Sequence, residues 1–294
     1  MRRLTGEALT LHALGRAGTY RSLEVLTPDG LRIAAQDWAR PTSGRDVLLI
    51  HGYSQSHLSW LKQVSGPLVD EFRLVTYDIR GHGASDKPLA AQFYADAERW
   101  AGEVEAVIKA AHLHRPVLLF WSYGGRIALD YLNCRGQQDV SGLVFVCATA
   151  KSGAGLAGPA APLRAAMTQD DLADNIAATT AFLRSCTAQP LPTAEFDYVL
   201  AFNMVVPPMV RAHLVGRAVD YEAILRAVAV PALVIHGSED AVNLPAVSQY
   251  IVANVPAARS ILYPGIGHTP FWENPQAFDR DLAEFLRDLP PLHP

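Results

Sequence analysis

Short apolar runs of strand type alternate with helical stretches along most of this chain. In chain order the strand-like runs are LRIAAQDW, DVLLIHG, FRLVTYDI, VLLFWS, LVFVCA, ALVIHG and SILYPG. Alternation of this kind is typical of βαβ units and a mostly parallel sheet. DVLLIHG is apolar at consecutive positions, as expected of a strand covered by helices on both faces. We therefore predict an α/β fold with a mostly parallel central sheet and helices on both of its faces.

One long segment interrupts this alternation. Residues 151–228 carry no strand signal, and their Ala, Leu, Met, Phe and Pro content suits short helices. We predict that residues 1–150 and 229–294 form the α/β core and that residues 151–228 form a helical cap, a lid inserted over a pocket. The alternative is a covering layer that never touches a substrate. Within the core, apolar spacing predicts helices at 94–113, 125–134, 246–255 and 275–286.

The stretch PVLLFWSYGGRIALDY predicts a buried strand, a sharp turn that carries Ser122, and then a helix. A serine at such a junction projects its hydroxyl out of the sheet, beside the N-terminus of the new helix. The pattern is Gly-x-Ser-x-Gly with one member altered: Phe120 replaces the first glycine, and Gly124 is the second. Ser122 is therefore our candidate nucleophile.

A serine attacks a carbonyl only if a base takes its proton and a carboxylate orients that base. His268 is the best base, because it follows the last predicted strand in a glycine-rich loop. Asp240 is the best acid, on the loop after the preceding strand, with Glu239 as its rival. All three candidates then lie at the carboxyl ends of parallel strands, where open α/β sheets hold their active sites. The other histidines in loops, at helix ends or at strand ends are expected to be surface or structural residues: His51, His82, His112, His114 and His236.

A tetrahedral oxyanion needs two preorganised hydrogen-bond donors. One is expected to be the backbone amide of Tyr123, directly after the candidate nucleophile. The other is expected to be the amide of Tyr53, because Gly52 lets the chain turn tightly after the strand DVLLI. The plain alternative for this loop is an ordinary strand-to-loop turn.

Five stretches resemble the α/β-hydrolase fold superfamily, its serine esterase and haloperoxidase-like branch, in the order and spacing of that family. They are LIHGYSQSHLSW, TYDIRGHGASDKP, FWSYGGRIALDY, VIHGSEDAVNLP and YPGIGHTPFWENP. The resemblance implies a Ser122, Asp240 and His268 triad, an oxyanion donor at Tyr53, and a mainly architectural role for residues 78–85. The family keeps a small residue at the position of Phe120, so the phenyl ring requires local space or a shifted helix. A serine nucleophile argues against epoxide hydrolase and haloalkane dehalogenase chemistry, which uses an aspartate.

Composition and charge limit the classes of molecule that this chain is expected to bind. The net charge is −4 and half of the residues are hydrophobic, so no basic field suits nucleic acid or an anionic membrane. No window approaches the length of a membrane span, and the first 18 residues lack a signal-peptide pattern. The three cysteines are too few and too scattered for a disulfide framework or a paired zinc motif. We expect a cytoplasmic protein whose partner is a small molecule.

These features together predict a serine hydrolase of small, largely apolar esters, with no metal and no organic cofactor. The pocket candidates are the aromatic residues near the two oxyanion donors, Trp60, Phe120 and Trp121, although large aromatics beside such a turn are as often core packing. The same triad could instead cleave a carbon–carbon bond, a lactone or an amide. A ligand-binding relative with little turnover is the alternative from another class of protein.

Overall fold

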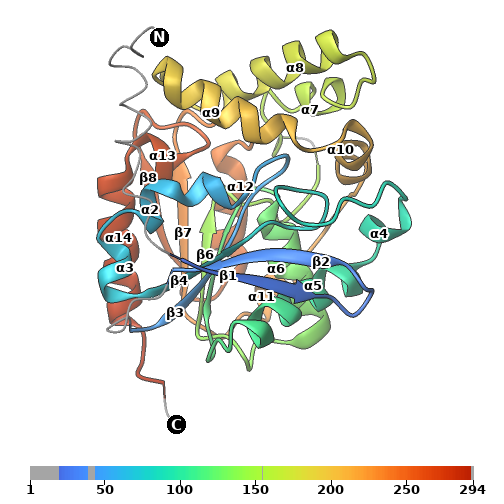
Figure 1. Cartoon of the computed structure of the whole chain (residues 1–294). Helices are drawn as coiled ribbons and strands as arrows, with labels where there is room; N and C mark the ends of the chain where they lie inside the picture. The colour runs from blue at the N-terminus through green and yellow to red at the C-terminus, as the bar shows by residue number, and fades with distance from the viewer. Residues whose placement is uncertain (1–19, 39–43, 154, 293–294) are drawn as a thin grey trace, which may run out of the picture.

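A single eight-stranded sheet forms the centre of the computed structural model, which describes residues 20–38, 44–153 and 155–292 (Figure 1). The first 18 residues, for which the sequence predicts no signal peptide, lie outside this range. The strands are β1 (Arg21–Leu26), β2 (Arg32–Asp37), β3 (Asp46–Ile50), β4 (Arg73–Tyr77), β5 (Val117–Trp121), β6 (Gly142–Val146), β7 (Ala232–Gly237) and β8 (Arg259–Tyr263). Their order across the sheet is β1-β2-β4-β3-β5-β6-β7-β8.

The sheet is mostly parallel, as predicted. β1 pairs with β2, and β2 with β4, in antiparallel fashion, and every other pairing is parallel. β5 lies between β3 and β6, so it is covered on both edges, and all of its residues are buried. The run VLLFW is apolar throughout because both faces of this strand meet helices.

The helices form two layers, one on each face of the sheet (Figure 1). One layer, whose apolar faces share a core with Leu48 and Phe120, contains α5 (Ala97–Ala110), α6 (Gly124–Arg135) and α12 (Pro245–Asn254). The other, which packs on Leu49 and Trp121, contains η1 (His57–Trp60), α2 (Leu61–Val64), α3 (Leu68–Glu71), α13 (Pro270–Glu273) and α14 (Pro275–Asp288). The two cores take alternate residues of β3, β4, β5, β6 and β7, as the period of two requires.

The predicted core helices are confirmed with small shifts at their ends. Residues 94–113 were expected to be one helix, but the short α4 (Gln92–Ala95) precedes α5. Asp96 separates the two with extended backbone, at φ −93° and ψ 133°. β1 was not predicted. It forms a hairpin with β2, and the signal for that hairpin was the turn sequence Pro28-Asp29-Gly30, where Gly30 has φ 86°.

The described residues between β6 and β7 form five helices: α7 (Leu163–Ala166), α8 (Leu172–Ser185), α9 (Thr193–Met204), α10 (Pro208–Val215) and α11 (Glu222–Arg226). The first four gather beyond the carboxyl ends of the parallel strands (Figure 1). α11 instead packs against α6 and α12 in the core layer. No single helix in the described part of the chain is long and apolar enough to cross a membrane. The pair α9 and α10 passes that test only together, across an 85° bend.

A buried arginine ties this group of helices together. Arg211 on α10 has no exposed surface, and its Nη1 donates to the carbonyl of Met167 at 3.2 Å, to Oδ1 of Asn175 at 2.7 Å and to the hydroxyl of Thr179 at 3.1 Å. Its Nη2 donates to the carbonyl of Asn203 on α9 at 2.6 Å. The Arg211 side chain therefore links α10 to α8, to α9 and to the end of α7.

Candidate active site

The turn between β5 and α6 holds Ser122 in a left-handed conformation, with φ 54°. A non-glycine residue in this region is uncommon and marks a constrained position. The tight packing of the turn explains why two glycines follow it. A Cβ on Gly124 would lie 2.6 Å from the carbonyl oxygen of Ile50, and one on Gly125 would lie 2.9 Å from that of Thr149. The turn is thus pressed against the loops that follow β3 and β6.

Phe120 does not disturb this turn. Its ring is fully buried, and it stacks edge-on against Phe145 of the neighbouring strand, with ring centroids 4.6 Å apart. The side chain points into the core on the α5 and α6 face of the sheet. The core on this face of the sheet therefore provides the space that the phenyl ring needs.

Ser122, His268 and Asp240 form one hydrogen-bonded chain at the carboxyl edge of the sheet. His268 Nε2 lies 2.8 Å from Ser122 Oγ, and His268 Nδ1 lies 2.6 Å from Asp240 Oδ2. All three side chains are buried, with Ser122 the most exposed at 6%. Because a carboxylate can only accept, Nδ1 carries the imidazole proton and Nε2 accepts from the serine hydroxyl. That is the tautomer in which the imidazole can take up the serine proton.

The Asp240 carboxylate is fully engaged. Its Oδ1 accepts from the amides of Val242 at 2.8 Å and Asn243 at 2.9 Å, and its Oδ2 accepts from His268 and from His236 Nε2 at 3.1 Å. Burial opposes ionisation of this carboxyl, but the two imidazoles outweigh it and hold the pKa of Asp240 well below its usual value. Asp240 is therefore an ionised acceptor at neutral pH.

His236 has a tautomer of its own. Its Nε2 faces two acceptors, Asp240 Oδ2 and the carbonyl oxygen of Asn243 at 2.9 Å, so this nitrogen carries the proton. Its Nδ1 then accepts from the hydroxyl of Ser248 at 2.6 Å. His236 is 1% exposed and cannot reach solvent. It is a second imidazole that fixes the carboxylate of Asp240.

The loop that carries His268 is clamped from several sides. The amide of His268 donates to the carbonyl of Cys186 at 2.9 Å, and its own carbonyl accepts from the indole of Trp121 at 2.8 Å. Glu273 accepts from the amides on both sides of His268 and from Ala188 at 2.7 Å. The position of this imidazole thus depends on residues after α8 as well as on the core.

Gly52 brings the loop after β3 against Ser122. A Cβ at Gly52 would lie 3.1 Å from the Cβ of Ser122. The next amide, that of Tyr53, donates to no acceptor in the described part of the chain, and the same holds for the amide of Tyr123. The residues that directly follow Gly52 and Ser122 therefore each carry an unengaged amide in the described part of the chain.

Two neutral histidines brace this loop. The amide of Ile79 donates to His51 Nε2 at 3.1 Å, and the amide of Ser54 donates to His82 Nε2 at 3.1 Å. Burial lowers the pKa of His51 to about 4 and that of His82 to about 3. Both rings stay neutral at physiological pH, because a charged ring could not accept these bonds.

The residues after β4 hold the neighbouring loop. Asp78 is fully buried, and its Oδ1 accepts from the amide of His57 at 2.7 Å while its Oδ2 accepts from that of Ala84 at 2.9 Å. Gly83 has φ 46°, and a Cβ there would collide with the Asp78 carboxylate at 2.1 Å. These contacts are of the architectural kind that the resemblance implied for residues 78–85.

The predicted pocket aromatics are not equivalent. Trp121 lines a small apolar chamber beside the His268 loop, between η1, α8, α9 and α13. Trp60 is fully buried behind it, 4.5 Å from the ring of Phe271, in the core beneath the chamber. Sequence reasoning missed the other lining residues, which are Gln55, Ser59, Leu183, Cys186, Thr187, Leu191, Val199, Phe202, Thr269, Phe271 and Trp272. They come from distant segments and share no local pattern.

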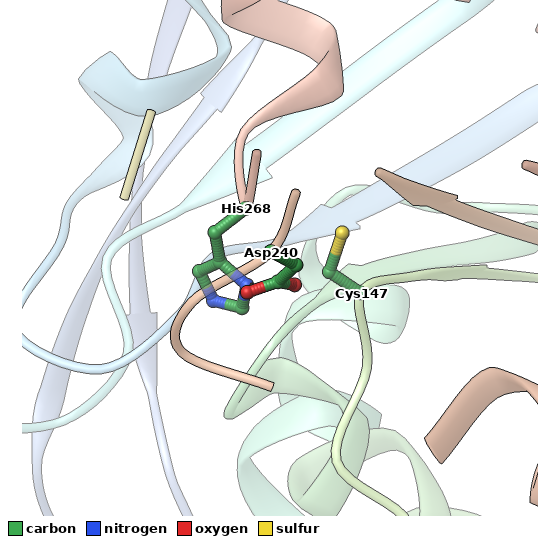
Figure 2. A group of neighbouring side chains, drawn as sticks. All are labelled: Cys147, Asp240 and His268. Carbon is green, nitrogen blue, oxygen red and sulfur yellow. The ribbon is translucent and has the colours of Figure 1, made fainter. Parts of the chain in front are cut away.

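A cysteine also lies against the acid. Figure 2 shows the Asp240 carboxylate between the His268 ring and Cys147, and the donor atoms of the three residues all lie within 4.8 Å of one another. Burial raises the pKa of the Cys147 thiol well above its usual value. A metal ion in this group would have to break the bond between His268 Nδ1 and Asp240 Oδ2, so the arrangement fits the hydrogen-bonded chain better.

The comparisons with known proteins define the class. Residues 47–281 match the model of the alpha/beta hydrolase family, so the chain belongs to that family. An esterase of a Rhodococcus species has a similar structure, with a TM-score of 0.86 and 32% identity over 92% of this chain and 99% of that one.

Two further proteins are similar in sequence along most of the chain. A pimeloyl-[acyl-carrier protein] methyl ester esterase of Vibrio cholerae is 27% identical over 84% of this chain and 96% of its own. A non-heme chloroperoxidase of Streptomyces lividans is 26% identical over 90% of this chain and 99% of its own. The chain is thus similar along nearly its whole length to proteins named for ester hydrolysis and for haloperoxidase activity.

Proposed function

We propose that this protein is a serine hydrolase that cleaves small, largely apolar esters through an acyl-enzyme on Ser122. The observation that carries the proposal is the chain from Asp240 through His268 to the serine hydroxyl, at 2.6 and 2.8 Å. The chamber beside Trp121 is apolar but only about 30 Å³, so it suits a small apolar group of the substrate. The esterase names of the Rhodococcus and Vibrio relatives support the bond type.

The first half of the reaction forms the acyl-enzyme. His268 Nε2 takes the proton of Ser122 as Oγ attacks the ester carbonyl. Negative charge develops on the carbonyl oxygen, and the amides of Tyr53 and Tyr123 are the donors suited to receive it. The imidazolium is stabilised by Asp240, and it then gives its proton to the leaving alcohol.

The second half reverses these roles with water. His268 removes a proton from a water molecule as its oxygen attacks the acyl carbon, and then returns the proton to Ser122 Oγ. The carboxylic acid leaves and the hydroxyl is restored.

The helices α8 and α9 cover this edge of the sheet, and Leu183 and Phe202 from them line the chamber. We assign residues 151–228 the role of a cap on this basis.

A fluorophosphonate probe tests the proposal directly. The probe should label the wild-type protein and should fail to label Ser122→Ala, because only an activated serine forms the phosphonyl adduct. Hydrolysis of aryl esters of increasing acyl length should be lost in the same variant. A folded wild-type protein that the probe does not label would contradict the proposal. Lactones, amides and vinylogous diketones in the same panel separate ester hydrolysis from the other reactions of this triad.

A further inference from the structure

A cavity of about 260 Å³ lies on the seam between the cap and the core. It is bounded by α6, α7, the end of α10 and α12, and its walls carry four cationic side chains: Arg126, Lys151, Arg164 and Arg217. No aspartate or glutamate is among its described lining residues. This local excess of positive charge contrasts with the net charge of −4 of the whole chain.

Two of the four cations already have counterions. Lys151 pairs with Asp220 and Glu222, both at 3.2 Å, and Arg217 pairs with Asp130. For Arg126 and Arg164, by contrast, no carboxylate of the described residues lies within 4.0 Å. The cavity is therefore lined by two uncompensated guanidinium groups.

Arg126 is the more unusual of the two. Its side chain lies at the first turn of α6, only 7% exposed, and packs over the Tyr123 ring with 5.0 Å to the ring centroid. Its Nη1 donates to the carbonyl of Arg217, but its Nε is buried without a partner among the described residues. Burial, together with the positive charges of Arg164 and Arg217, lowers the pKa of Arg126. A buried cation without a counterion is costly, and buried donors without acceptors are rare in native proteins.

The cavity adjoins the serine turn. The amide of Thr149, a lining residue, donates to the carbonyl of Ser122 at 2.9 Å. Asn243, another lining residue, donates its amide to Asp240. On the cap side, the carbonyl of Arg164 accepts from the Tyr53 hydroxyl at 3.2 Å. An anion in the cavity would thus lie next to the loops that carry the candidate triad and oxyanion donors.

We propose that this cavity is a binding site for a small-molecule oxyanion, a carboxylate or a phosphate group, held by Arg126 and Arg164. Guanidinium groups suit these anions because their planar donors match two oxygens at once. The anion has two conceivable sources, the charged end of a substrate or a free anion that acts as an effector. Only the substrate source rests on the proposed hydrolase function.

Direct binding tests the site without any turnover. Isothermal titration of Ser122→Ala with inorganic phosphate and with glutarate should detect binding of at least one of them. Adding Arg126→Gln should weaken that binding by about tenfold or more, because a charge-assisted hydrogen bond is lost. Arg164 is only half-buried, so Arg164→Gln is a second variant in case the first fails to fold. It should also weaken binding. Arg280→Gln, on the exposed face of α14, is the matched control and should bind like its parent.

Kinetics with the wild-type protein distinguish the two sources. Monomethyl esters of dicarboxylic acids of increasing length are compared with neutral methyl esters of the same length. A preference for the anionic esters in kcat/KM, reduced in Arg126→Gln and retained in Arg280→Gln, assigns the site to the substrate. Phosphate or glutarate binding without such a preference assigns it to a free anion.

The site proposal is overturned if neither phosphate nor glutarate binds, or if binding is unchanged in both arginine variants. Its failure is distinguishable from failure of the proposed function. The titrations use Ser122→Ala and need no hydrolysis, whereas the fluorophosphonate experiment reads the serine alone.

Discussion

His236 Nε2 lies 3.1 Å from Asp240 Oδ2, so the acid of the candidate triad is held by two imidazoles rather than one. The second imidazole has no path to the substrate, because it is 1% exposed behind the carboxylate. Its contribution would be to hold the carboxylate in the plane that His268 requires. Ser248 supports it in turn by donating to its Nδ1.

Replacing His236 with Phe should therefore lower kcat about 10-fold to 100-fold while KM changes little, by analogy with other residues that orient a catalytic group. The reason is that Asp240 keeps its charge but loses one of its two side-chain donors. Steady-state kinetics with an aryl ester measure both constants. Ser248→Ala, which removes the support of His236 but keeps the ring, is the milder matched variant. An unchanged kcat in His236→Phe would contradict the positioning role.

His268→Ala should reduce kcat by about four orders of magnitude or more, because the serine loses its base. Asp240→Asn should reduce kcat by a similar factor, since an amide can donate to Nδ1 and reverse the tautomer of the imidazole. The double variant should be little worse than either single variant, as is usual for groups that act as one unit. Near-normal turnover of either single variant would remove that residue from the mechanism. Thermal unfolding of each variant is the control for folding.

Much of the fold could be predicted because the central strands are apolar at consecutive positions, as is typical of a sheet covered on both faces. β1 escaped prediction because it is an edge strand with mostly exposed residues. Its alternation is weak, and its best signal was the hairpin turn at Gly30 rather than the strand itself. Helix ends moved by a few residues, as capping is decided by local contacts.

The parts of the candidate site that lie in local sequence motifs could be predicted. The parts that depend on contacts between residues far apart in the sequence could not. Ser122 stands between a strand and a helix, so the turn is visible in the chain. His236 was visible only as a histidine at a strand end, and its contact with Asp240 depends on how the β7 loop folds back. The chamber and the cationic cavity combine residues from segments more than a hundred positions apart. Phe120 broke the expected motif, yet the ring points into the core.

Gly52 should be intolerant of a side chain for a functional reason. A Cβ there would meet Ser122 Cβ at 3.1 Å and the Trp121 ring at 3.3 Å, so the loop must move back by a few tenths of an ångström. That shift moves the Tyr53 amide away from the developing oxyanion, and we expect Gly52→Ala to lower kcat about 100-fold. Kinetics at saturating ester measure the loss.

The matched control is Gly102→Ala within α5, because among the described residues a Cβ at Gly102 would meet only the Pro28 side chain, at 3.3 Å. That variant should keep its activity. Should Gly52→Ala turn over at the wild-type rate, the amide of Tyr53 would not be the donor that we propose.

The two histidines that brace the Tyr53 loop should make folding stability fall in mild acid. Burial holds the pKa of His51 at about 4 and that of His82 at about 3, below the usual 6.5. As the pH falls from 6.5 towards 4, the unfolded chain therefore binds protons that the folded protein refuses. Each histidine then lowers the free energy of unfolding by up to about 1.4 kcal/mol per pH unit.

Asp279 acts in the opposite direction and supplies the internal control. Burial raises its pKa from 3.8 to about 6, so between these values the folded protein holds a proton that the unfolded chain has lost. Asp279 therefore raises the free energy of unfolding as the pH falls through this range. Its contribution offsets the loss caused by about one of the two histidines. Urea unfolding between about pH 7 and pH 4 should show a moderate loss of stability in the wild-type protein and a clearly steeper one in Asp279→Asn. A free energy of unfolding that does not change with pH, or equal slopes for the two proteins, would show that these buried groups do not titrate as their surroundings require.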